Sequence, residues 1–354
     1  MGDSKIKVMI VDDSSVIRKI VGEALSNDPH LEVADKAPNG KIALQKMSIS
    51  KPDIIILDIE MPEMNGFETL KELRKTDKTT KVIMFSSMSR SSAEITLEAL
   101  SLGANDFVIK PDNVSDISNL FSTLREKLIP RIYSICDLTE RAEEKVSHHV
   151  RAYSALDSAK VSIVVIGVST GGPTALEKVI PALPSDLQVP VVIVQHMPPI
   201  FTKSLATRLN SISALKVVEA SDNQEISRGN VYIAPGGKHI VLDKLDLIRT
   251  VIRTNEDPPE NSCRPAVDVL FRSAAHAYGK NTLAVVMTGM GADGTKGGKS
   301  IVDSGGQLII QDKASSVVWG MPGSIADAGL AHGIFPLNRI ADEICGRVNK
   351  PRRI

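Results

Sequence analysis

The chain has 354 residues, 42% of them hydrophobic and 24% charged, and its 42 basic side chains balance 42 acidic ones. This length exceeds what one hydrophobic core usually supports, so we expect two domains. The even charge argues against nucleic acid as a partner. The longest apolar stretches, at residues 163–168 and 189–194, are far shorter than the roughly 18–20 residues of a membrane span, so no membrane insertion is expected.

The N-terminus and the cysteines indicate the compartment. The sequence MGDSKIKVMIVDDS places acidic residues directly after its apolar run and lacks a small-residue cleavage site, unlike a secretory signal. Cys136, Cys263 and Cys345 are odd in number, far apart and outside any CxxC pair, which indicates neither a disulfide framework nor a zinc site. We therefore expect a cytoplasmic protein.

The N-terminal third alternates short β-branched runs with segments of helical period, which predicts a doubly wound parallel sheet of five strands. The expected strands are 7–11, 32–37, 53–57, 81–85 and 106–109. The expected helices are 15–26, 40–48, 66–75, 93–102 and 115–128. We assign residues 1–124 to this domain and 125–160 to a linker.

The linker contains a charged, weakly periodic stretch at residues 131–160 with some helical character. It holds the adjacent pair His148 and His149. Neighbouring histidines do not face one another on a helix, so solvent exposure is favoured over metal binding.

Residues 161–348 again read as mostly parallel α/β structure, with an antiparallel insertion at 231–253. Strand patterns begin at Val161 and Val189 and continue at 229–234, 239–242, 247–253, 282–288 and 307–311. Helical patterns lie at 173–182, 201–209, 266–278 and 295–303.

Polar residues follow four of the N-terminal strands. Asp12 and Asp13 come after the first strand, Asp58 after the third, Ser86 after the fourth and Lys110 after the fifth. The carboxyl ends of parallel strands share one edge of the sheet, so these groups converge there. Carboxylates suit a hard cation such as magnesium, and the cation and an ammonium can neutralise a phosphoryl group transferred to a carboxylate.

This domain resembles the receiver domain of response regulators through VDDS at residues 11–14, LDIEMPEMNG at 57–66 and KP at 110–111. The resemblance implies a flavodoxin-like fold and phosphorylation by a sensor histidine kinase. It also implies roles for particular residues: phosphoacceptor Asp58; Mg²⁺ ligands Asp13 and Asp58 directly, Asp12 mainly through water and Glu60 through its backbone carbonyl; switch residues Ser86, Phe107 and Lys110, with Ser87 a competitor for the hydroxyl role.

In the C-terminal domain, Ser169 lies in G-x-S-x-G, formed with Gly167 and Gly171, between a strand and a helix. This motif is typical of a nucleophile elbow, although a serine there is more often only a helix cap. His196 ends the next strand and can act as a general base. Asp293 follows a third strand and can orient the imidazole. Together they predict a hydrolase. His239 and His276 are poorer bases by position, and we expect structural roles for them.

Two other enzyme classes fit less well. Gly289, Gly291 and Gly294 spell G-x-G-x-x-G, and Asp312 follows near the offset of a ribose-binding acid, as in dinucleotide-binding folds. However, Asp293 would repel the pyrophosphate. An α/β-hydrolase has its triad in the order serine, acid, histidine, whereas here histidine precedes the acid.

These motifs, with RPAVDVLF at residues 264–271 and SSVVWGMP at 315–322, resemble the catalytic domain of chemotaxis protein-glutamate methylesterases. The resemblance implies hydrolysis of glutamate γ-methyl esters on the cytoplasmic helices of chemoreceptors, release of methanol, and deamidation of receptor glutamines. It implies nucleophile Ser169, acid/base His196, orienting Asp293 and the Met290 backbone amide as an oxyanion donor. It implies no cofactor in this domain.

Regulation and docking are hypotheses at this point. We expect the unphosphorylated receiver domain to cover the Ser169 edge and phosphorylation of Asp58 to weaken that contact. Because the tail KPRRI lacks an aromatic, acidic tethering peptide, receptor docking is expected elsewhere, either through Phe201, Thr202 and Arg208 or through other contacts. A noncatalytic output module, with the glycine-rich turn cradling an anion, is the alternative.

Overall fold

The computed structural model describes residues 5–110, 121–136, 160–246 and 248–348. The chain divides into two compact units, Met1–Glu143 and Glu144–Ile354, and each is described by itself. Pro111, His148, His149 and the C-terminal tail lie outside the described residues.

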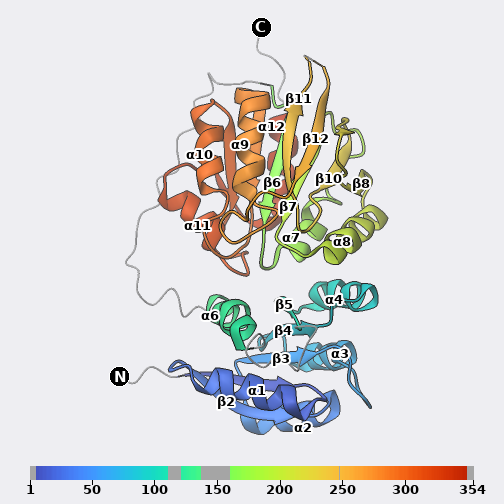
Figure 1. The fold of residues 1–354 in the computed structure, drawn as a ribbon, viewed down its shortest axis with the longest axis vertical. Coiled ribbons are helices and arrows are strands. Elements are labelled where there is room, and N and C mark those ends of the chain that lie inside the picture. Colours follow the sequence, from blue (N-terminus) through green and yellow to red (C-terminus); the bar gives the residue numbers. More distant parts are fainter. Residues whose placement is uncertain (1–4, 111–120, 137–159, 247, 349–354) are drawn as a thin grey trace. The chain divides into compact units, whose positions relative to one another are not determined.

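The first unit is a five-stranded parallel sheet in the order β2-β1-β3-β4-β5 (Figure 1). This is the flavodoxin-like order, and the expected fold class is confirmed. The strands are β1 (Ile6–Val11), β2 (Leu31–Ala37), β3 (Ile54–Asp58), β4 (Lys81–Ser86) and β5 (Asp106–Ile109). The helices are α1 (Ser15–Ser26), α2 (Gly40–Ser50), α3 (Gly66–Thr76) and α4 (Arg90–Leu102).

Local sequence explains where these elements begin. The Ser14 side chain accepts a hydrogen bond from the Ile17 N–H and caps α1. Asn65 and Glu68 form a reciprocal capping box at the start of α3. Every residue of the central strand β3 is buried, as expected for a parallel sheet covered by helices on both faces.

The last part of the first unit is helical. A π-helical segment, η1 (Leu124–Leu128), leads directly into α6 (Ile129–Ile135). Residues 115–120 of the expected helix at 115–128 lie outside the described residues. From residue 121 the chain is helical and continues to residue 135, so the expected domain boundary at 124 falls inside a helical run. Leu124, Leu128 and Ile132 are fully buried, which explains why the helix continues.

The second unit has a seven-stranded parallel sheet in the order β15-β14-β13-β6-β7-β10-β8 and a separate antiparallel sheet in the order β11-β12-β9. The strands are β6 (Ile163–Val168), β7 (Val191–Gln195), β8 (Lys216–Glu219), β9 (Gln224–Glu225), β10 (Asn230–Ile233), β11 (His239–Lys244), β12 (Thr250–Asn255), β13 (Thr282–Val286), β14 (Gln307–Gln311) and β15 (Ile334–Phe335).

The helices of this unit are α7 (Gly172–Val179), α8 (Pro199–Ile212), α9 (Val267–Tyr278), the short 3₁₀ turn η3 (Gly279–Asn281), α10 (Thr295–Asp303), α11 (Gly320–Asp327) and α12 (Leu337–Val348). Helices α9 and α10 pack side by side (Figure 1). Val267, Leu270 and Phe271 of α9 are fully buried in the core that this helix shares with the strands. Within the described part of the chain, no helix is both long and apolar enough to traverse a bilayer.

The antiparallel insertion is smaller than expected. The predicted start at residue 231 is wrong, because β10 runs parallel to β7 and β8, with Val231 opposite Val191 and Ile233 opposite Ile193. Both valines and both isoleucines are fully buried, so the segment belongs inside the main sheet. The antiparallel sheet consists of β11 and β12, with β9 beside β12.

The strand order creates a switch point beside β6. The chain passes from β6 to β7 on one side and later returns to β13 on the other side. Right-handed crossovers then place the helices of the two halves on opposite faces, which opens a crevice at the carboxyl ends of these strands. Ser169, His196 and Asp293 follow β6, β7 and β13, respectively.

Candidate functional site

Three loops of the second unit are joined by backbone hydrogen bonds around Ser169. The Ser169 N–H donates to the Thr288 carbonyl (3.0 Å), which ties the β6 end to the loop after β13. The His196 N–H donates to the carbonyl of Val168 (3.3 Å), directly before Ser169. The strand register therefore brings together the three segments that carry the expected nucleophile, base and orienting acid.

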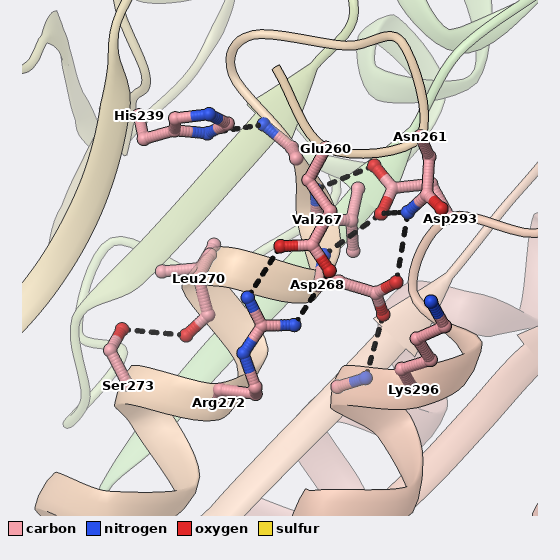
Figure 2. A network of polar contacts seen from close by, with 12 residues as sticks. His239, Glu260, Asn261, Val267, Asp268, Leu270, Arg272, Ser273, Asp293 and Lys296 are labelled. Carbon is pink, nitrogen blue, oxygen red and sulfur yellow. Dashed lines mark hydrogen bonds and ion pairs between the residues drawn. The ribbon is translucent and has the colours of Figure 1, made fainter. Parts of the chain in front are cut away.

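His196 and Asp293 are in direct contact. The His196 Nε2 lies 2.8 Å from Asp293 Oδ2, and Asp293 is only 2% exposed. The same carboxylate accepts hydrogen bonds from the backbone N–H groups of Val267 (2.7 Å) and Asp268 (3.0 Å), at the start of α9 (Figure 2). A helix N-terminus stabilises an anion through such N–H groups.

These contacts set the charges of the pair. Burial alone would raise the pKa of Asp293, but the hydrogen bond to His196 and the backbone donors outweigh it and lower the pKa. Burial alone would lower the pKa of His196, but the Asp293 hydrogen bond, together with Cys263, raises that pKa to about 9. The pair therefore favours a carboxylate facing an imidazolium.

The other imidazole nitrogen faces a thiol. The Sγ of Cys263 lies 3.5 Å from His196 Nδ1. Since Nε2 is used by Asp293, Nδ1 is the nitrogen left to accept a proton from a nucleophile. Within residues 160–246 and 248–348, no hydrogen bond joins the Ser169 hydroxyl to this ring. The structure thus forms the acid–imidazole pair and places the serine beside it without that third bond.

The backbone around Ser169 has the form of a tight strand-to-helix turn. The Ser169 carbonyl accepts hydrogen bonds from the Gly172 N–H (2.7 Å) and from Nε2 of Gln195 (3.0 Å). Gly171 has a φ of 75°, a conformation that glycine adopts without strain. The turn leads directly into α7, so the N-terminal end of a helix lies next to the serine.

The loop after β13 approaches Ser169 very closely. A side chain at Gly289 would place its Cβ 2.8 Å from the Ser169 Cβ, so only glycine fits there. The next residue is Met290. Among the hydrogen bonds between described residues, none uses the Met290 N–H. Met290 therefore follows the glycine that contacts Ser169 and has a backbone donor without a partner among the described residues.

The remaining polar candidates of this unit have structural surroundings. His239 is 1% exposed; its Nδ1 accepts from the Ala266 N–H and its Nε2 donates to the Pro258 carbonyl, both at 3.2 Å. His276 lies within α9. The Asp312 carboxylate accepts hydrogen bonds from the N–H and hydroxyl of Ser315 in a turn. None of the three contacts the His196–Asp293 pair.

The docking hypothesis for α8 is wrong for two of its three residues. Phe201 and Thr202 are 0% exposed, so neither can meet a partner protein. The Thr202 hydroxyl donates to Glu219 (2.7 Å) and accepts from the Gly236 N–H (3.0 Å), which explains its burial. Arg208 is partly exposed and forms an ion pair with Glu177.

In the first unit, Lys110 joins two buried carboxylates. Its Nζ lies 2.8 Å from Asp12 Oδ2 and 2.7 Å from Asp58 Oδ1. Asp13, which is exposed, completes a group of three carboxylates whose ligand atoms all lie within 4.8 Å of one another. Three carboxylates against one ammonium leave excess negative charge, and carboxylate oxygens suit a hard divalent cation. The donor set therefore fits Mg²⁺.

The pKa of Asp58 responds to this crowding. Burial raises it to about 6, with Asp12 adding to the effect and Lys110 opposing it. Burial disfavours the Lys110 ammonium, but Asp12 and Asp58 outweigh that and raise its pKa. Lys110 therefore remains charged beside a carboxylate that is costly to ionise.

The expected switch residues Ser86 and Phe107 lie in β4 and β5, and Glu60 follows β3. Ser86 is fully buried, and its hydroxyl donates to the Ser87 carbonyl (3.2 Å) and accepts from Thr96 of α4 (2.9 Å). The Glu60 side chain accepts a hydrogen bond from Ser92 (2.8 Å). Phe107 is buried, with 8% of its surface exposed.

Sequence reasoning missed several residues around His196 and Asp293. Cys263 appeared only as an isolated cysteine. The Asn261 amide donates hydrogen bonds to the carboxylates of Asp268 and Asp293, and the Asp268 N–H also donates to Asp293 (Figure 2). Asp268 lies within the RPAVDVLF motif, so a buried acid amid apolar helix positions was the available signal. No pattern marked Asn261, because its placement depends on a turn far from Asp293 in the sequence.

Both units are similar to known protein families. Residues 164–344 match the family model of the CheB methylesterase, and residues 8–122 match that of the response regulator receiver domain. A Trichodesmium erythraeum protein named protein-glutamate methylesterase/protein-glutamine glutaminase is 48% identical, covering 97% of this chain and 99% of the relative. A Thermotoga maritima relative with the same name is 41% identical, covering 97% of this chain and 99% of its own length.

A solved structure matches the second unit. The crystal structure of the Thermotoga maritima CheB methylesterase catalytic domain is 46% identical, with a TM-score of 0.51, and covers 52% of this chain and 98% of its own.

Proposed function

The chain belongs to the CheB methylesterase family, and on that premise we propose that it hydrolyses glutamate γ-methyl esters on the cytoplasmic helices of chemoreceptors. The products are methanol and the free carboxylate. The same site converts particular receptor glutamines to glutamates, with ammonia as the leaving group. This activity gives sensory adaptation in bacterial chemotaxis, and its substrate implies a cytoplasmic location.

The observation that carries this proposal is the His196–Asp293 contact beside Ser169, at the switch point of the sheet. In the proposed mechanism, the imidazole takes the Ser169 proton as Oγ bonds to the ester carbonyl carbon. The Met290 amide donates to the oxyanion. The carbon–methoxy bond then breaks, and methoxide takes the proton from His196. Water, deprotonated by His196, then bonds to the acyl carbon, the acyl–Oγ bond breaks to release the glutamate, and His196 returns the proton to Ser169 Oγ.

The imidazole must be neutral to take a proton from Ser169 and from water, and it must be protonated to give a proton to methoxide and back to Ser169. Asp293 supports both by holding one nitrogen of the ring while the other exchanges the proton. Because Nδ1 is the exchanging nitrogen in this geometry, Cys263 must yield its contact when the Ser169 hydroxyl approaches.

We propose that the first unit, predicted as residues 1–124 and continued by the helical run to residue 135, regulates the catalytic residues 161–348. A sensor histidine kinase supplies the phosphoryl group to Asp58. Asp13, Asp58 and the Glu60 carbonyl would hold Mg²⁺ directly and Asp12 mainly through water, and the bound cation would neutralise phosphoryl charge. Lys110 adds a positive charge, and Ser86 and Phe107 respond to the phosphorylated state.

The test is methanol release from methylated receptor membranes. Ser169→Ala is expected to lower kcat by several powers of ten, since nucleophile and base act as a unit. The matched control is Ser162→Ala, directly before the other end of β6, where the hydroxyl donates to the Lys160 carbonyl; it should retain the wild-type rate. Equal rates for wild type and Ser169→Ala would exclude the serine mechanism and favour a noncatalytic module.

A further inference from the structure

A tight turn at residues 260–263 projects toward the His196–Asp293 pair. Glu260 and Cys263 exchange two backbone hydrogen bonds, of 3.1 and 2.9 Å, as in a two-residue hairpin. The central residues Asn261 and Ser262 have φ values of 51° and 60°. Turns of this kind need left-handed residues at both central positions, and asparagine adopts that conformation more readily than most side chains.

The turn is fastened to α9. Arg272 forms a two-pronged ion pair with Glu260, at 2.8 and 2.5 Å (Figure 2). Such paired contacts fix orientation as well as distance. The turn therefore holds a defined position over the N-terminal end of α9, where Asp293 is bound.

From this position the Asn261 amide reaches two buried acids. Its Nδ2 donates to Asp293 Oδ1 (2.8 Å) and to Asp268 Oδ2 (2.9 Å) (Figure 2). The two carboxylates are 2% and 1% exposed, whereas Asn261 itself lies at the surface. An amide nitrogen carries two N–H groups, so this single side chain adds a donor to each acid. The backbone N–H of Gly294 also reaches both carboxylates, at 3.0 Å to each.

The electrostatics explain why a neutral double donor suits this place. Two buried carboxylates disfavour each other's ionisation. Burial, with a contribution from Asp293, raises the pKa of Asp268, and the Asn261 hydrogen bond opposes that rise. A lysine here would compete with the imidazolium for Asp293, and an acid would add a third negative charge.

We propose that Asn261 is a positioning residue for the reaction, acting through Asp293 on His196. Its amide bridges Asp268 and Asp293, adds to the backbone N–H groups of Asp268 and Gly294 on the second Asp293 oxygen, and disperses negative charge that would otherwise hold the proton on the imidazole. This inference rests on the proposed methylesterase function and adds to it the residue that tunes the base.

The charged and titratable groups around the pair all belong to the same network. Asp268 and Arg272 come from α9, Glu260 from the turn and Lys296 from α10 (Figure 2). The turn also supplies Cys263, which faces His196. Only Asn261 donates to both buried acids among the described side chains. Its removal therefore leaves the number of charges unchanged and alters only how the acids are held.

The direct test is Asn261→Gly in the full chain. Glycine keeps the left-handed turn and removes only the amide. Asp293 loses a donor, so its charge acts more strongly on the imidazolium. The pH at which kcat/KM rises should therefore move upward, and kcat should fall about tenfold with KM unchanged, since one hydrogen bond to a charged group is lost.

The matched control is Asn223→Gly. Asn223 also has a left-handed backbone, with φ 59°, and its Nδ2 also donates to a carboxylate, that of Asp222 (2.7 Å), but it lies in the turn before β9. This variant should retain the wild-type rate and pH profile. An unmoved profile in Asn261→Gly, or an equal shift in Asn223→Gly, would overturn the proposal.

A second variant, Asn261→Asp, tests the proposal in case Asn261→Gly does not fold. Asn261→Asp keeps the size of the side chain and adds a negative charge, so the profile should move upward further than in Asn261→Gly. If circular dichroism showed that both Asn261 variants were unfolded while Asn223→Gly was folded, the amide would be a stability residue and the proposal would be overturned.

A readout independent of activity separates this inference from the function. The His196 ring can be titrated by NMR in ¹³C-histidine-labelled full-length protein, with His196→Gln to assign the signal. Its pKa should rise in Asn261→Gly. If wild type and Ser169→Ala released methanol at the same rate, the proposed function would be refuted. If the His196 pKa were the same in Asn261→Gly as in wild type, the role of Asn261 would be refuted.

Discussion

Buried carboxylates serve opposite purposes in the two units, and their hydrogen-bond partners decide which. Asp293 accepts backbone N–H groups from the start of α9, and its pKa is lowered, so it stays ionised. Asp58 is equally buried but lies beside Asp12, and its pKa is raised to about 6. The environment of Asp293 stabilises a carboxylate that orients His196. The environment of Asp58 destabilises its carboxylate, so metal binding or phosphorylation of Asp58 relieves an unfavourable negative charge.

The cost of ionising the buried Asp58 carboxylate predicts that a neutral side chain at this position stabilises the folded protein. Because its pKa in the folded state lies above the ordinary aspartate value of 3.8, its contribution to stability is present below pH 3.8 and is lost as the pH rises through about 6. Asp58→Asn should therefore raise the free energy of unfolding at pH 7.5 in EDTA by about 3 kcal/mol. Below pH 4 the two proteins should unfold alike. Urea titrations at both pH values measure this, and a destabilised variant at pH 7.5 would contradict it.

The raised pKa of His196 predicts the pH dependence of the esterase. A general base must be neutral, and the Asp293 contact holds the proton on the ring until the pH approaches about 9. We therefore expect kcat/KM for ester hydrolysis to rise with pH through this value. Initial rates between pH 6 and 10 test it. A profile already flat at pH 7 would show that the imidazole is neutral in the free protein.

The predicted elements of the receiver unit agree with the structure because each strand is a compact apolar run between clear helix caps. In the second unit β8, β9 and β15 were missed, since each has at most four residues and lies at a sheet edge. Helix α11 begins with GMPG, which argues against a helix, and packing of Met321 and Ile325 in the core overrides that preference. The apolar residues of helix α12 recur with helical spacing, so the absence of a predicted helix at residues 337–348 is wrong.

The candidate sites were predictable to the extent that they follow strand ends. Ser169, His196, Asp58 and Lys110 lie where the carboxyl ends of parallel strands place them. Asn261 and Cys263 were not predictable, because their turn precedes a helix and only its attachment to Arg272 brings it to the pair.

The loop after β13 depends on one glycine. In Gly289→Ala the new Cβ would lie 2.8 Å from the Ser169 Cβ and would also meet Met321, so the loop must move. Displacement of a catalytic group by about 1 Å can lower a rate about a hundredfold, and we expect a loss of that size in kcat. The control is Gly346→Ala in α12, where a Cβ meets nothing within 4 Å; it should keep full activity and gain about 0.5–1 kcal/mol of stability. Full activity in Gly289→Ala would show that the loop need not be fixed.

The whole chain combines a receiver domain with a methylesterase domain, and the family membership of both parts makes phosphorylation the expected control of hydrolysis. In the full chain, a small acyl phosphate with Mg²⁺ should raise the rate of methanol release, and Asp58→Asn should abolish that increase. A fragment that begins at residue 160 distinguishes inhibition from activation. If the unphosphorylated receiver inhibits, the fragment is faster than the intact chain, and equal rates would refute inhibition.

The most direct measurement of the central claim is mass spectrometry of the covalent intermediate. Acid quenching of the full chain during turnover of a γ-methyl-glutamyl receptor peptide should trap the peptide as an ester on Ser169, and the adduct should be absent in Ser169→Ala. An adduct on another residue, or release of methanol with no dependence on Ser169, would contradict the account.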